Sequence, residues 1–473
     1  MPVNCTFFSD RVMKINKADV IWNYAATILR VASYALLLPF ILRTMPAEMV
    51  GVWSVFMAIN SFAALLDLGF SPSFTRNITY IFSGVKALKV TGFHAEDADK
   101  SVDYGLLKGI IAAMKWFYLR MSLILFFLLA TLGTFYLWTV LKNYKGPQTE
   151  IYAAWAVLCV ICTYTIYTQY LDCLLQGKGM VKRSKQIVIA GQSVYLLIAA
   201  VFIMSDFGLL AIVSAQAISV IIIRVLVSKS FFTDEIRSAL KAVVPRPRKE
   251  VLQAIYPNAI KIGLTWIGAF VIQKSSILAG SLYLPLEDIA SYGITIQLIS
   301  MIANFSTIYT STYTPKIVQL RVAKDDAAIK EVYLKGQLVL LFTYIAGGAA
   351  ILFLGKWGLQ LIGSKTELME FALIALTLII AFLESNHGVA AGILLTNNEV
   401  PFFKASLAAA AVTITLLYAM LYIFNMGLWA MVLAPGIAQL YNNWRWPYEL
   451  YRQLNISRRD MGKVVKHRIK AIR

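Results

Sequence analysis

The chain has 473 residues, 59% of them hydrophobic, and a mean hydropathy of +0.67. This composition excludes an ordinary soluble domain, because apolar stretches long enough to cross a bilayer as helices recur throughout. A transmembrane barrel is disfavoured, since the stretches are continuous and lack the alternation of barrel strands. The formal net charge is +19. The basic residues lie between the apolar segments, which favours positive-inside topology over nucleic-acid binding.

The first apolar segment, residues 20–42, contains one charged residue, Arg30. At 1.5 Å rise per residue, Arg30 lies roughly 16 Å from Asp19 and roughly 20 Å from Arg43. A guanidinium at that depth should face protein or a water-filled cavity. The pattern predicts a bundle with a hydrophilic, cationic interior, and the alternative is an arginine that pairs with a carboxylate between helices. The polar residues of the segment fall on one helical stripe: Asn23, Thr27, Arg30 and Tyr34.

Eleven further apolar segments bring the predicted number of spans to twelve, so both termini lie on one side. Lysine and arginine are concentrated on that side, which places the termini in the cytoplasm. The polar segment 229–255 is a predicted linker between an N-terminal lobe, residues 1–228, and a C-terminal lobe, residues 256–449, and a basic tail, 450–473, follows. The predicted fold is an all-α polytopic membrane protein with two six-helix lobes around a central cavity. The spans are residues 20–42, 47–68, 116–140, 151–175, 187–205, 207–227, 257–282, 286–312, 336–355, 369–395, 405–425 and 427–445.

Two segments echo each other at corresponding positions of the lobes. Residues 46–53, PAEMVGVW, follow the first span, and residues 285–292, PLEDIASY, follow the seventh. Both share the pattern Pro-x-Glu-x-x-small-x-aromatic. Because both run from the far face back to the cytoplasm, they predict a parallel repeat with a pseudo-two-fold axis along the membrane normal.

Polar residues deep in the spans are the candidates for a substrate site, which in a two-lobe transporter lies near mid-membrane. Arg30 and Lys274 would bind an anionic group, although Lys274 lies nearer the far face and could extend to the interface instead. The eighth span carries a polar face over several turns, which should line a cavity or hydrogen-bond another helix. The candidates for contacting a glycan are Asn23, Asn60, Gln297, Ser300, Asn304 and Thr307.

Glu384 and His387 lie three residues apart on one face of the tenth span. A carboxylate and a histidine can exchange protons near neutral pH, so they are candidates for coupling transport to a proton gradient. They could equally form an internal pair, or Glu384 could be the partner of Arg30. Asp67 and Asp172, near the cytoplasmic ends of their spans, are predicted to pair with basic residues such as Arg76.

No enzyme motif is found. The chain has neither HExxH nor a Walker A sequence, and the loops on the far face are little more than turns. Cys159 and Cys162 form a CxxC inside an apolar segment, where small hydrophobic residues are the expected interpretation. We therefore expect no catalytic residue, no metal site and no cofactor. The energy for transport would come from an ion gradient, of H⁺ or Na⁺, or from the substrate's own gradient.

Short motifs, the span number and the basic tail resemble those of the polysaccharide flippases in the multidrug/oligosaccharidyl-lipid/polysaccharide exporter superfamily. The resemblance implies a bacterial inner-membrane protein that moves undecaprenyl-pyrophosphate-linked O-antigen or capsule repeat units to the periplasmic leaflet. It also implies a cationic central cavity, and contact with membrane lipids and with other polysaccharide-assembly proteins. The motifs are Gly51-Val-Trp53, Leu66-Asp67-Leu68-Gly69, Arg76 and Leu175-Gln-Gly177-Lys-Gly179.

The sequence thus predicts a lipid-linked oligosaccharide flippase that works by alternating access. A drug or cation exporter of the same superfamily is the first alternative, although it would need acidic residues deep in the cavity. A membrane glycosyltransferase or polymerase of polysaccharide assembly is the second, and it would need carboxylates or a substantial loop at one membrane face. The short far loops argue against the second alternative.

Overall fold

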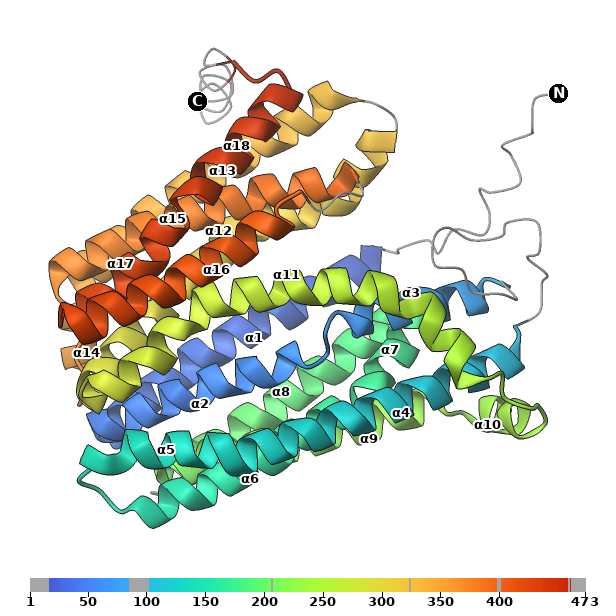
Figure 1. Cartoon of the computed structure of the whole chain (residues 1–473), viewed down its shortest axis with the longest axis horizontal. Helices are drawn as coiled ribbons and strands as arrows, with labels where there is room; N and C mark the ends of the chain where they lie inside the picture. The colour runs from blue at the N-terminus through green and yellow to red at the C-terminus, as the bar shows by residue number, and fades with distance from the viewer. Residues whose placement is uncertain are drawn as a thin grey trace. The chain divides into compact units, whose positions relative to one another are not determined.

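A computed structural model of the chain describes residues 17–84, 102–205, 207–322, 325–397, 401–457 and 460. Every regular element in these residues is a helix (Figure 1). Short π-helical turns extend three of the helices, at Leu129–Gly133, Ala350–Leu354 and Ala419–Ile423. The helices are α1 (Lys17–Thr44), α2 (Ala47–Leu65), α3 (Phe70–Phe82), α4 (Tyr104–Leu128), α5 (Thr134–Val140), α6 (Gln148–Tyr167), α7 (Gln169–Gly177), α8 (Val181–Met204), α9 (Gly208–Phe231), α10 (Asp234–Lys241), α11 (Arg248–Tyr283), α12 (Leu286–Val322), α13 (Asp326–Ala349), α14 (Gly355–Leu361), α15 (Phe371–Leu394), α16 (Phe403–Tyr418), α17 (Leu428–Ala438) and α18 (Leu440–Gln453).

The all-helical membrane fold is confirmed. Each of the twelve predicted spans overlaps helical residues. Within the described residues, nine helical segments are long and apolar enough to cross a membrane, so the full count of twelve stays a prediction. The helices also run beyond the apolar stretches: the third span, predicted from residue 116, begins at Tyr104, and the ninth, predicted from residue 336, begins at Asp326. Hydropathy marks the hydrocarbon core, whereas a helix continues through polar residues at the interface.

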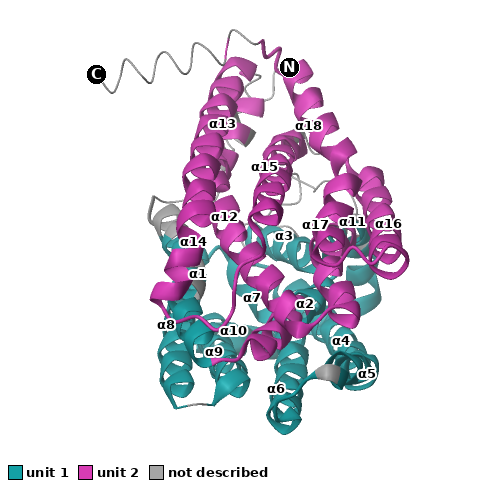
Figure 2. Cartoon of the chain, turned by 90° about the vertical axis from the view of Figure 1, so that its left-hand side faces the viewer, with its two compact units in different colours: residues 1–44, 59–266 teal, residues 45–58, 267–473 magenta. Residues whose placement is uncertain are grey.

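The chain forms two compact units (Figure 2). Unit 1 comprises residues 1–44 and 59–266, and unit 2 comprises residues 45–58 and 267–473. One boundary lies at the end of α1, and the other two fall inside α2 and α11, each of which continues from residues of one unit into residues of the other. In unit 1, α8 packs against α1 and α9, and in unit 2, α12 packs against α13 and α15. The division into lobes at a linker of residues 229–255 stays a prediction.

The predicted linker is partly helical and is fixed to unit 1. Residues 234–241 form α10, and the segment after it docks on the first turn of α4. Asp103 accepts the Leu106 amide at 2.8 Å, which caps α4, and forms an ion pair with Arg246 at 2.6 Å. The Lys108 ammonium donates to the Val243 carbonyl at 2.7 Å. These contacts therefore hold the chain between α10 and α11 against the start of α4.

Asp67 in unit 1 holds the turn between α2 and α3. Leu68 and Gly69 have positive φ angles of 46° and 71°, and the first amides of the helix that follows have no partner within the helix. The Asp67 carboxylate accepts the Ser71 amide at 3.0 and 3.1 Å and the Tyr118 hydroxyl at 2.7 Å. The prediction that Asp67 pairs with Arg76 is wrong, because the Ser71 amide and the Tyr118 hydroxyl are its donors.

The predicted ion pairing of Asp172 with a basic residue is confirmed, since Asp172 of α7 forms an ion pair with Arg224 of α9.

The two echoing segments contact each other inside unit 2. A Cβ on Gly51 would lie 2.2 Å from the Leu286 carbonyl oxygen, so the backbones approach closely there. Likewise, a Cβ on Gly293 would lie 2.2 Å from the Ser54 Oγ. Ser54 and Gly293 occupy equivalent positions in the repeat, eight residues after Pro46 and Pro285. Residues related by a two-fold axis touch each other only near that axis, so this contact agrees with the predicted symmetry.

The end of the described chain is tied to α13. The Lys330 ammonium donates to the Asn455 carbonyl at 2.8 Å and pairs with Asp460 at 2.6 Å. Hydrogen bonds from Lys330, and then from Ser457, lower the pKa of the Asp460 carboxyl. The bonds thus favour the charged form of Asp460 and keep this tail residue beside Lys330 of α13.

Candidate functional site

Unit 2 contains a cavity of about 400 Å³ that brings four of the sequence-predicted residues together. Lys274 comes from α11, Ser300 and Asn304 come from α12, and Glu384 comes from α15. Ser300 and Asn304 lie four residues apart, so they share one helical face and point to the same side. The cavity lining therefore has one cation, one carboxylate, four hydroxyl side chains and two amides, and its other residues are apolar.

Lys274 is partly buried and contributes the only cationic side chain to this cavity lining. Among the described residues it forms no ion pair and no hydrogen bond. Glu384 lines the same cavity, yet the two side chains do not form an ion pair. A partly buried ammonium without a counter-charge is costly. Lys274 is therefore placed to receive an anionic group from a ligand.

Polar side chains are hydrogen-bonded to one another at the junction of α17 and α18. The Trp446 indole donates to the Asn442 Oδ1 at 2.9 Å, and the Asn442 Nδ2 donates to the Gln439 Oε1 at 2.7 Å. All three residues are buried. The Gln439 oxygen is already used as an acceptor, so its amide nitrogen is the group that can donate to a further acceptor.

His387 contacts α18 through Asn443. Its Nδ1 lies 2.6 Å from the Asn443 Oδ1. That oxygen can only accept, so Nδ1 carries the proton and Nε2 is the nitrogen available to a second proton. His387 is not among the residues that line the cavity, so Glu384 alone of the pair faces it. Within the described residues, no group of three His, Cys, Asp or Glu side chains could hold a metal ion.

A proline fixes the wall formed by α17. Pro435 lies inside the helix and has no amide proton, so the carbonyl four residues earlier, at Met431, loses its helical donor. Ser276 of α11 donates to this carbonyl at 2.8 Å, and the Tyr292 hydroxyl of α12 donates to it at 3.5 Å. Three helices of the cavity wall are joined at one carbonyl. The proline is visible in the sequence, but its partners on α11 and α12 are not.

The other predicted site residues lie elsewhere. Arg30 and Asn23 belong to α1, but their side chains lie outside the described residues. Asn60 belongs to unit 1, where its Oδ1 accepts the Cys162 thiol at 3.4 Å, so its place in a substrate cavity stays a prediction. Gln297 lies on α12 but is not among the lining residues.

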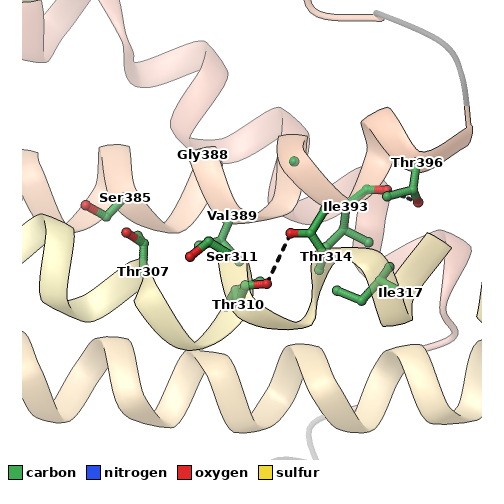
Figure 3. Close-up of a pocket in the computed structure, with 11 residues that line it drawn as sticks. Thr307, Thr310, Ser311, Thr314, Ile317, Ser385, Gly388, Val389, Ile393 and Thr396 are labelled. Carbon is green, nitrogen blue, oxygen red and sulfur yellow. Dashed lines mark hydrogen bonds between the residues drawn. The ribbon is translucent and has the colours of Figure 1, made fainter. Parts of the chain in front are cut away.

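Thr307 lines a second cavity of about 270 Å³ in unit 2, between α12 and α15 (Figure 3). Ser385 lines both cavities, and it follows Glu384 directly in the sequence. The Ser385 Oγ lies 2.7 Å from the Tyr344 hydroxyl of α13, which also donates to the Ala381 carbonyl at 2.8 Å. The two cavities are therefore neighbours along the α12 and α15 pair.

No family model and no curated protein matches the chain. Solved structures with a similar fold include the lipid II flippase MurJ in an inward closed conformation, at 13% identity and a TM-score of 0.64, covering 95% of this chain and 90% of MurJ. An inward-facing multidrug resistance MATE family transporter of the MOP superfamily matches at 14% identity and a TM-score of 0.63, covering 94% and 99% of the two chains. The MATE multidrug transporter DinF-BH, solved in a complex, matches at 16% identity and a TM-score of 0.62, covering 93% and 96%. These neighbours are transporters and flippases, not enzymes, and the chain has the fold of the MOP superfamily transporters.

Proposed function

We propose that this protein is a flippase for lipid-linked oligosaccharides. It moves undecaprenyl-pyrophosphate-linked repeat units of the O-antigen or capsule kind from the cytoplasmic to the periplasmic leaflet of a bacterial inner membrane by alternating access. The observation that carries the proposal is the cavity of unit 2, where Lys274 forms no ion pair among the described residues and faces the same space as Ser300 and Asn304. One solved structure of similar fold is a lipid II flippase.

The chemistry of the cavity fits the task. Moving an unpaired charge into hydrocarbon costs many kcal/mol, so a pyrophosphate needs a polar path across the bilayer. Lys274 supplies a point charge for a phosphate oxygen, and Arg30 of α1 is proposed as a second cation. The Asn304 amide can both donate to and accept from sugar hydroxyls, and Ser300 can do the same. The polyprenyl chain stays in the lipid, so only the headgroup has to be transferred.

Glu384 favours a second candidate, the export of organic cations. Its carboxylate lines the same cavity as Lys274 and would attract a positively charged ligand. DinF-BH, which has a similar fold, is a multidrug transporter. Lys274 disfavours this candidate, because a cation that entered the cavity would be repelled by the ammonium.

Reconstituted transport separates the two candidates. The purified protein is placed in liposomes with a fluorescent undecaprenyl-pyrophosphate-linked oligosaccharide, and accessibility to an external quencher reports its leaflet. In parallel, vesicles are loaded with the organic cation ethidium and its efflux is followed. Movement of the lipid-linked sugar without ethidium efflux supports the flippase. Ethidium efflux with an immobile lipid-linked sugar would replace it by the exporter.

Coupling by Glu384 predicts a specific loss in the Glu384→Gln variant. A gradient of one pH unit supplies about 1.4 kcal/mol for each coupled proton, which corresponds to about a tenfold effect. Wild-type transport is expected to respond to an imposed gradient by up to that factor, whereas the variant should keep its basal rate and lose the response. The matched control is Glu367→Gln, which removes an exposed carboxylate before α15. A variant that responds to the gradient like the wild type would exclude Glu384 as the coupling group.

A further inference from the structure

The second cavity of unit 2 has no charged residue in its lining. It lies between α12 and α15 and shares Ser385 with the charged cavity (Figure 3). Its wall is made of hydroxyl side chains, glycines and β-branched aliphatic residues: Thr307, Thr310, Ser311, Thr314, Ile317, Ser385, Gly388, Val389, Gly392, Ile393 and Thr396. We therefore expect the part of a ligand that lies in this cavity to be uncharged.

Three hydroxyl groups of the wall have their protons already in use. Thr307 donates to the Ala303 carbonyl at 2.9 Å, and Thr314 donates to the Thr310 carbonyl at 3.3 Å. Thr396 donates to the Ile393 carbonyl at 2.6 Å. The proton of each is thus bonded to a carbonyl three or four residues earlier, and the oxygen lone pairs remain free to accept. These oxygens can accept from the hydroxyl donors of a ligand.

Two glycines of α15 provide the space. Gly388 and Gly392 lie one helical turn apart, and a Cβ built on either would meet no atom within 4 Å. Glycines that allow close helix packing behave differently, as at Gly293, where a Cβ would lie 2.2 Å from Ser54. Gly388 and Gly392 therefore do not serve a tight contact with α12. Their missing side chains leave room for a ligand.

The wall offers both kinds of surface that match a sugar ring. Most of its exposed lining is apolar, and hydroxyl oxygens are set among the aliphatic side chains. A sugar ring has hydroxyl donors around its edge and apolar C–H faces. The hydroxyl oxygens match the donors, while Val389 and Ile393 match the C–H faces.

We infer that this second cavity binds uncharged sugar residues of the lipid-linked oligosaccharide, while the charged cavity binds its pyrophosphate end. The inference rests on the proposed function and adds a subsite to it. It assigns Gly388 and Gly392 a role in specificity for glycan length. A substrate with a single sugar would use the charged cavity alone.

The Gly392→Leu variant tests this subsite, because Gly392 lines the cavity and a Cβ there meets no atom within 4 Å. The probes are undecaprenyl-pyrophosphate-linked monosaccharide and tetrasaccharide in the liposome assay. The variant should move the monosaccharide at the wild-type rate and the tetrasaccharide about tenfold more slowly, which corresponds to about 1.4 kcal/mol. The matched control is Gly358→Leu in α14, where a Cβ also meets nothing and which lines neither cavity. The control should move both probes normally, and Gly392→Ala confirms that the position tolerates a side chain.

Each other outcome overturns the inference in a distinguishable way. Equal slowing of both probes by Gly392→Leu, with a normal control, would mean that the cavity holds a part common to both substrates, such as the polyprenyl chain. Normal transport of both probes would show that the cavity is not used, while the flippase function stands. A wild-type protein that moves neither probe would overturn the function and the subsite together.

Discussion

Lys274→Gln is expected to slow transport of a lipid-linked oligosaccharide by about 10- to 100-fold. A hydrogen bond between a charged donor and a phosphate contributes about 1.5–3 kcal/mol, and each 1.4 kcal/mol is a factor of ten. Among the described residues Lys274 has no ion-pair partner, so its loss leaves no carboxylate unpaired. Stability should therefore change little while transport falls. The liposome assay measures the rate, and thermal unfolding in detergent measures the stability.

Two further variants make this result specific. Lys274→Arg keeps the charge and should retain a large part of the rate, although the planar guanidinium binds phosphate with a different geometry. Lys356→Gln removes an exposed lysine of α14 and should transport normally. A cation exporter predicts the opposite sign, because removal of the ammonium would increase ethidium efflux. A normal rate of sugar transport in Lys274→Gln would remove Lys274 from the mechanism.

The sequence predicts well those features that follow from periodicity along one helix. The polar face of α12 places Ser300 and Asn304 on one side, and the structure finds both in one cavity. Lys274 and Glu384 were selected as rare charges inside apolar segments, and they line the same cavity. Such residues can be found one helix at a time, because the cost of a polar group in lipid depends on its own position.

Features that depend on packing between helices were missed. Gln439 and Asn442 lie in a predicted span, residues 427–445, which contains the junction of α17 and α18. Their amides were a visible signal in an apolar segment, but the sequence does not indicate that they hydrogen-bond to each other at that junction. The boundaries of the two units inside α2 and α11 were missed for the same reason, since hydropathy locates spans and not their neighbours. The partner of Asp172 lies 52 residues away, beyond the nearby bases that sequence reasoning considered.

Breaking the ion pair between Asp172 and Arg224 is expected to give the largest loss of stability. The Arg224 residue is 7% exposed, and the pair joins α7 to α9 inside unit 1. Asp172→Ala leaves a buried guanidinium without its counter-charge, which costs about 3–5 kcal/mol. The measurement is the free energy of unfolding in detergent, with Asp234→Ala as the control. Asp234 forms an exposed pair with Arg237 at 3.9 Å, and the loss of such a pair costs about 1 kcal/mol or less.

The double variant Asp172→Leu/Arg224→Met separates electrostatics from packing. Replacing a buried pair by apolar side chains of similar volume is often neutral or stabilising, because both desolvation penalties disappear. The double variant should therefore recover most of the stability that Asp172→Ala loses. A double variant as unstable as Asp172→Ala would mean that the geometry of the pair, not its charge balance, holds α7 against α9. Normal transport by a stable double variant would place the pair outside the transport mechanism, in contrast to Lys274, whose charge has no such partner in the described chain.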